Sequence, residues 1–116
     1  MPSYFEGLGL IAIECLASGL RTVSTEIEGL MCLLGERVNN SGVIEYVPLP
    51  RLHDVDRPYE EDMDAFVDAL AEKLRVQVER VERGEPFPME IQEEIMQHSW
   101  AAITDRVECM LRDAVK

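Results

Sequence analysis

The sequence predicts an α/β fold with a short parallel sheet followed by long C-terminal helices. Two short strand-like stretches, 21–24 and 43–47, alternate with apolar segments of helical pattern at 10–18 and 29–35. Strand, helix and strand in alternation favour parallel pairing of the strands. Beyond residue 63 the apolar residues recur at three- and four-residue steps, which is typical of amphipathic helices.

The first element is a loop that leads into a helix. Gly7 and Gly9 relax the backbone, and an apolar helix is expected from Leu10 until Gly19 ends it. Because this helix is apolar almost all round, we expect it to be buried. Glu14 is the exception, and a carboxylate there needs either a pairing partner or a cleft to face. Glycines before a helix N-terminus let a ligand approach the backbone, and the helix dipole favours an anion such as phosphate.

The next three elements complete the expected sheet. The β-branched stretch 21–24 fits a buried strand, and 29–35 is an apolar helical segment closed by a glycine. A strong turn signal at 39–42 precedes the second strand, 43–47, which two prolines terminate. Ser24 and Thr25 lie near the end of the first strand, where hydroxyls reach a phosphate or, more often, serve a structural role.

The second half of the chain is expected to be helical. Residues 51–57 are interpreted as a loop, and Pro58 fits the first position of a helix. The helical periodicity then continues from Met63 to Gly84. The two remaining predicted helices are Met89 to Gln97 and, with Ser99 as its N-cap, Trp100 to Ala114.

Length and composition limit the possible functions. A chain of 116 residues with 47% hydrophobic residues is long enough for one domain with a modest core. The net charge of −12 argues against nucleic acid and anionic lipid as partners of these residues. The sequence contains neither a long apolar run nor a secretion signal, so we expect a cytoplasmic protein. The three cysteines lack metal-ligand spacing and are expected to be free thiols.

The start of the chain carries a resemblance to a known family. Residues 2–19 have the pattern Pro-Ser-x-x-Glu-Gly-x-Gly-Leu-x-x-x-Glu-x-x-Ala-x-Gly. This pattern resembles the donor-binding signature of family 4 (group 1) glycosyltransferases, which are retaining enzymes of GT-B fold with two Rossmann-like domains facing a cleft. Arg21 departs from the family, which usually has a proline at this position. The resemblance implies that residues 1–116 are the C-terminal part of the nucleotide-sugar-binding domain, a partial Rossmann-like unit without the N-terminal acceptor domain and the first strands.

The resemblance also implies roles for individual residues. Glu6 would contact hydroxyls of the donor sugar and is the candidate catalytic residue, and Glu14 would hold the ribose hydroxyls of the nucleotide. The backbone that would approach the sugar and the diphosphate belongs to Gly7, Leu8, Gly9 and Leu10. No metal and no other cofactor is expected, because the family does not usually need a divalent metal.

The implied reaction is transfer of a sugar from a nucleoside-diphosphate sugar to an acceptor hydroxyl with retention. In the family such transfer often serves polysaccharide or glycoconjugate biosynthesis, including capsule and exopolysaccharide, and a full-length enzyme can dock on membranes. We expect residues 1–116 alone to be inactive as a hexosyltransferase, because the acceptor domain and the upstream phosphate contacts are missing from them.

Two other functional classes remain open. The chain is alternatively a truncated, non-catalytic remnant or a nucleotide-binding module that needs its N-terminal domain or another chain as partner. A purely structural partner module is the third alternative. A sheet of two strands and a remnant would expose an edge, which allows self-association.

Other chemistry-bearing residues have simpler interpretations. Cys15 follows Glu14 on the apolar helix and is interpreted as a small core residue. His53 and His98 have no nucleophile or acid at a recognisable spacing and are expected at the surface. The acidic run between Asp54 and Asp68 is interpreted as a solvated face, because its carboxylates point around a helix and not to one point.

Overall fold

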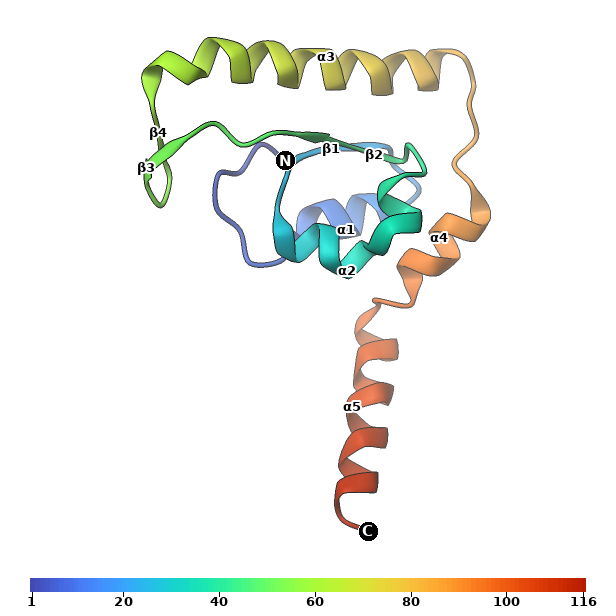
Figure 1. Ribbon diagram of the computed structural model, residues 1–116. Helices are drawn as coiled ribbons and strands as arrows, with labels where there is room; N and C mark the ends of the chain where they lie inside the picture. The colour runs from blue at the N-terminus through green and yellow to red at the C-terminus, as the bar shows by residue number, and fades with distance from the viewer.

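The computed structural model describes residues 1–116 and confirms an α/β arrangement with a short parallel sheet and long C-terminal helices. In chain order the elements are α1 (Leu10–Ala17), β1 (Thr22–Thr25), α2 (Glu28–Asn39), β2 (Ile44–Val47), β3 (Leu52–Asp54), β4 (Arg57–Pro58), the 3-10 turn η1 (Glu60–Asp62), α3 (Met63–Glu82), α4 (Met89–Met96) and α5 (Trp100–Ala114). Figure 1 shows α3 along one face of the sheet, α1 and α2 on the other face, and α5 projecting away from the remaining elements.

The parallel sheet consists of β1 and β2. Residues 22–25 pair in register with residues 44–47. No further strand joins the other edge of β1, where only Met1 forms ladder-like hydrogen bonds. The Met1 ammonium donates to the carbonyl oxygen of Val23 at 2.6 Å, and the Met1 carbonyl accepts from the Thr25 amide at 3.2 Å. The open edge expected from the sequence is therefore present, along the outer side of β1 and also along that of β2.

The apolar core has two parts, one on each face of the sheet. The larger cluster joins α1, α2, α4 and β2, and its fully buried members include Leu16, Leu30, Leu34, Ile44 and Ile95. The smaller cluster lies under α3 and contains Val23, Val47 and Phe66. These clusters make the domain a three-layer unit with the sheet in the middle.

Polar contacts join α3 to both strands of the sheet and to the turn before β2. The Gln77 amide donates to the carbonyls of Thr22 at 3.1 Å and Gly42 at 3.2 Å. Glu45 on β2 accepts from Lys73 at 2.9 Å and from Arg80 at 2.7 Å. Burial acts to raise the pKa of Glu45, but the hydrogen bonds from Lys73 and Arg80 outweigh it and lower that pKa. The ionised carboxylate therefore helps to hold α3 against the sheet.

The first helix differs from the prediction. We expected α1 to be buried all round, whereas only Ala12, Ile13 and Leu16 are buried. The side chain of Leu10 is 48% exposed and that of Ile11 is 65% exposed. The reason is that α1 packs with one face on the core formed with α2 and α4, and no element covers its other face.

The connection to α3 also differs from the prediction. Pro58 does not begin a helix but lies in β4, which pairs antiparallel with β3 to form a hairpin in the predicted loop. The long helix begins at Met63, as the periodicity indicates, and η1 precedes it. Gly35 interrupts α2 with φ 76° and ψ 168°, but a second helical piece follows to Asn39. Glycine permits this left-handed φ, so the predicted stop is a kink.

The last helix is as predicted at its start. The Ser99 hydroxyl oxygen accepts a hydrogen bond from the Ala102 amide at 3.3 Å and caps α5. None of the residues of α5 is buried, and Trp100 is 74% exposed. No helix in the structure combines the length and the apolar character needed to cross a membrane.

The Glu45 contacts give a test of the fold. Replacement of Glu45 by Gln should lower the free energy of unfolding at pH 7 by about 1 kcal/mol, since Lys73 and Arg80 lose a charged acceptor that is partly screened by solvent. The folded-state pKa of Glu45 is below its ordinary value of 4.5. The difference in free energy of unfolding between wild type and Glu45→Gln should therefore be full above pH 4.5. It should disappear as the pH falls through the folded-state pKa of Glu45.

Urea unfolding followed by circular dichroism between pH 7 and pH 3 measures this difference. Glu72→Gln is the matched control, because Glu72 forms an exposed ion pair with Arg75 on the same helix. An equal loss of stability in both variants, or a difference that does not depend on pH, would contradict the proposed role of Glu45.

Candidate functional site

The candidate site begins with the loop between Met1 and α1, which lies at the carboxyl end of β1. Thr25, the last residue of β1, donates its hydroxyl proton to the carbonyl of Ser3 at 2.5 Å. The Ser24 hydroxyl donates to the Thr25 carbonyl, so both hydroxyls form bonds within the protein. Ligands of parallel α/β sheets bind beyond the carboxyl ends of the strands. The loop thus lies beyond the carboxyl ends of the strands, where a ligand is expected.

The glycine at the start of α1 is required by its backbone conformation. Gly9 is the N-cap of α1 and has φ 68° and ψ 50°, in the left-handed region. Its carbonyl accepts from the Ala12 amide at 3.0 Å and begins the helix. No side chain caps this end of α1 and no acidic residue lies in its first turn. The first amides of the helix and the positive end of its dipole are therefore available to an anion.

The other loop glycine plays a different part. Gly7 does not have a positive φ, and a Cβ built on it would meet no atom within 4 Å. Its carbonyl oxygen instead packs on Gly29 at the start of α2, where a Cβ would lie 2.1 Å from that oxygen. No local pattern in the sequence connects Gly29 with the loop, because the two segments meet only in the folded chain. Because Gly29 has no side chain, the Gly7 carbonyl can pack against the start of α2. The open space beside Gly7 leaves the loop backbone accessible to a ligand.

Glu14 lies beside a cavity of about 330 Å³ between α1 and the start of α5. Glu14 is exposed on α1. Two other residues with a predicted role at the donor site, Leu8 and Leu10, also line this cavity. The remaining lining residues are Ile13, Ala17, Leu33, Ile95, Met96, His98, Ser99, Trp100 and Ile103. A mainly apolar cavity with a few polar groups at this volume is typical of small-molecule sites.

Glu6 lies in the loop and does not line that cavity. Its side chain is exposed and accepts a hydrogen bond from the Ser3 hydroxyl at 3.2 Å. The structure therefore brings Leu8, Leu10 and Glu14 together but leaves Glu6 outside their cavity. The residues that sequence reasoning missed are His98 and Trp100, which the packing of α4 and α5 brings to Glu14.

The charges around the site are mostly negative. No lysine or arginine lines the cavity at Glu14, where His98 is the one basic side chain. No group of three or more His, Cys, Asp or Glu side chains is placed to hold a metal ion. The positive potential available to an anion therefore comes from the amino end of α1.

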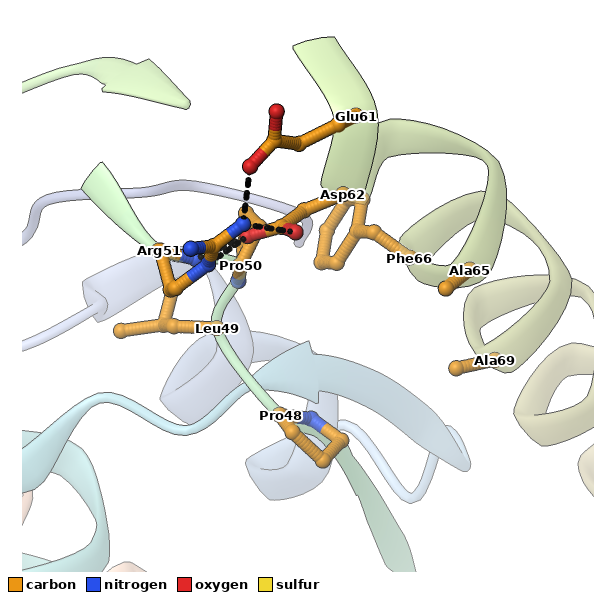
Figure 2. A pocket seen from close by; sticks show the side chains of 9 residues that line it. All are labelled: Pro48, Leu49, Pro50, Arg51, Glu61, Asp62, Ala65, Phe66 and Ala69. Carbon is orange, nitrogen blue, oxygen red and sulfur yellow. Dashed lines mark hydrogen bonds and ion pairs between the residues drawn. The ribbon is translucent and has the colours of Figure 1, made fainter. Parts of the chain in front are cut away.

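A second cavity, of about 390 Å³, lies beyond the carboxyl end of β2. Figure 2 shows Arg51 in this cavity with its guanidinium directed at Glu61 and Asp62. The distances are 2.5 Å to Glu61 and 2.8 Å to Asp62, and the guanidinium also lies 5.2 Å from the centre of the Tyr59 ring. The hydrogen bond with Asp62, followed by that with Glu61, raises the pKa of Arg51. Because two carboxylates already hold this cation, it is a poor candidate for a phosphate contact.

Comparison with protein-family models, with curated proteins and with solved structures found no match. The candidate site consequently depends on its geometry and on the sequence pattern of residues 2–19.

The contact between the loop and α2 can be tested with two glycine substitutions. Gly29→Ala should lower the free energy of unfolding by about 1–3 kcal/mol, because its methyl group overlaps the Gly7 carbonyl and the loop must move. Gly7→Ala should change stability by less than about 0.5 kcal/mol, because its methyl group meets open space. Thermal and urea unfolding of both variants measure these effects. Equal stabilities, or a larger loss for Gly7→Ala, would contradict this packing.

Proposed function

We propose that the chain is the C-terminal part of the nucleotide-sugar-binding domain of a retaining GT-B glycosyltransferase. The observation that carries the proposal is the position of the signature: its glycine loop leads into the uncapped amino end of α1 at the carboxyl edge of the parallel sheet. The finer fold assignment, a partial Rossmann-like unit, belongs to the same proposal. The pattern of residues 2–19 supplies the substrate class, a nucleoside-diphosphate sugar.

The diphosphate would bind at the amino end of α1. There the amides of Leu10 and Ile11 precede the first amide that the helix uses internally, which is that of Ala12. Amides and a helix dipole directed at a leaving diphosphate stabilise the charge that develops on it. An alanine at Gly7 would fill the space through which such a ligand approaches the loop.

The two carboxylates would contact hydroxyl groups. An ionised carboxylate only accepts hydrogen bonds, so it pairs with sugar hydroxyls and repels phosphate. Glu14, within α1, would hold the ribose, and the exposed Glu6 would contact the transferred sugar. In this arrangement the sugar hydroxyls and the diphosphate have separate binding groups on one loop and one helix.

We do not propose that residues 1–116 catalyse the sugar transfer alone. The cavity at Glu14 has no lysine or arginine to balance a diphosphate, and the acceptor hydroxyl has no assigned site in these residues. The exposed apolar residues around the signature, Phe5 and Ile11 among them, also suit a surface that another domain covers. Catalysis would then require the acceptor domain, and residues 1–116 alone would supply the donor half of the site.

One alternative function has a specific observation in its favour. The exposed helix α5 and the open edge of β1 are features of a module that binds another chain. A nucleotide-binding or interaction module without catalysis shares the donor loop but needs no acceptor site. A non-catalytic remnant would keep the same donor loop, but its affinity for a nucleotide would no longer be under selection.

Nucleotide binding distinguishes these functions. Isothermal titration of the chain with UDP, GDP and ADP should show saturable binding of at least one nucleotide, and Glu14→Ala should weaken it about tenfold, as expected for loss of charged hydrogen bonds to the ribose. The control is Glu36→Ala, which removes an exposed carboxylate on α2 outside the cavity.

A folded wild-type chain that binds none of the three nucleotides would contradict the proposed donor site and favour an interaction module. Equal affinities of wild type and Glu14→Ala would contradict the ribose contact alone. Circular dichroism of every variant separates a lost contact from a lost fold.

A further inference from the structure

The helix α5 carries an apolar stripe that the rest of the structure covers only at its start. Figure 1 shows α5 projecting away from the other elements, and none of its residues is buried. This stripe, which we call the α5 stripe, recurs at alternating steps of three and four residues and consists of Trp100, Ile103, Val107, Met110 and Ala114. Such a repeat of seven is the spacing with which two helices pack in a coiled coil. Trp100 and Ile103 also line the cavity at Glu14, whereas Val107 and Met110 are 49% and 71% exposed.

We propose that two copies of the chain associate through the α5 stripe, with their α5 helices antiparallel and related by a two-fold axis. This inference does not depend on the donor site. In an antiparallel pair of helices each residue at the first apolar position of the repeat lies opposite one at the second. Val107 would therefore lie opposite Met110 of the second copy, and Ala114 opposite Ile103. The two-fold axis repeats both contacts, so one self-complementary surface buries the stripe of both chains.

The charged residues beside the α5 stripe fit an antiparallel pair of identical helices. Arg106 and Asp113 each come directly before a residue of the stripe and lie seven residues apart. In the antiparallel pair these two positions face each other, so Arg106 of each copy would meet Asp113 of the other. In a parallel pair Arg106 would instead face Leu111, which offers no charge. A helix of another sequence, including one from residues outside 1–116, would cover the stripe without requiring this self-complementary spacing.

Arg106 has no carboxylate partner within its own chain. Its guanidinium donates only to backbone carbonyls, whereas the two later cations form ion pairs, Arg112 with Glu108 and Lys116 with Asp113. Asp113 uses one carboxylate oxygen for Lys116, so the other oxygen can accept from Arg106 of the second copy. The dimer would therefore give Arg106 the carboxylate that the single chain does not provide.

The distribution of charge along the chain also favours contact through α5. Residues 100–116 contain three acidic and three basic residues, so the net charge of −12 lies entirely in residues 1–99. Two such acidic bodies repel each other. In the antiparallel pair they lie at opposite ends of helices about 22 Å long, well beyond the screening length of about 8 Å at physiological ionic strength. A parallel pair would instead place both bodies at the same end.

Sedimentation equilibrium of the full chain, from about 10 μM to about 1 mM, tests the proposal. The high concentrations are needed because a helix of 15 residues offers a short interface, and the wild-type chain should form dimers within this range. Arg106→Asp and Asp113→Arg should each raise the dimer dissociation constant about tenfold, because like charges then face each other at both ends of the interface. An equimolar mixture of the two variants should form heterodimers with about wild-type affinity, because every facing pair is again of opposite charge.

Matched controls lie on the opposite face of α5. Arg112→Asp and Asp105→Arg make the same charge changes away from the stripe and should alter the dissociation constant by less than about twofold. Val107→Glu should abolish the dimer and keep the circular dichroism of the monomer, because Val107 is not buried in the single chain.

Three results would overturn the proposal. A chain that stays monomeric up to about 1 mM would assign the α5 stripe to another polypeptide. Charge variants that weaken the dimer no more than their controls, or a mixture without heterodimers, would exclude the antiparallel pairing. A dimer that survives Val107→Glu would place the contact on another surface of the chain.

Discussion

The hydrogen bonds between the first three residues and β1 are the interaction on which the site depends. Met1 bonds to Val23 and Thr25, and the Thr25 hydroxyl bonds to the carbonyl of Ser3. These contacts hold the loop at the carboxyl end of the sheet, so that its next residues lead into α1. Partial burial lowers the pKa of the Met1 ammonium, which reflects its position against the strand. Without this attachment a loop of two glycines would have no fixed path across the sheet.

The sequence alone predicted the positions of helices and strands better than the tertiary contacts around them. Helical periodicity located the long helix from Met63, and the Ser99 cap of α5 is present. The prediction that Pro58 begins a helix is wrong, because the β3–β4 pairing depends on a partner strand that local propensity does not reveal. The burial of α1 was overestimated for a related reason. Apolar composition indicates that a face can be covered, but only the fold shows whether Leu10 and Ile11 are covered.

For the candidate site, the sequence indicates a flexible glycine loop before a helix, and in the structure Gly9 has a left-handed conformation and Glu14 lies beside a cavity. The contacts of these residues with a nucleotide sugar stay predictions. The support from Gly29 and the approach of His98 and Trp100 were not predictable, because each brings together residues distant in the chain. Residues that act through tertiary contacts leave no local spacing in the sequence. The separation of Glu6 from the cavity at Glu14 likewise follows from the path of the loop.

The central claim is that the amino end of α1 binds the diphosphate of a nucleotide, and NMR titration tests it most directly. On addition of UDP, GDP or ADP, the amide signals of residues 7–11 should shift together and saturate, because these amides surround the glycine loop and the uncapped helix end. The signals around Arg51, whose guanidinium is held by Glu61 and Asp62, should not move. Shifts confined to the surroundings of Arg51, or no shifts in a folded chain, would contradict the account.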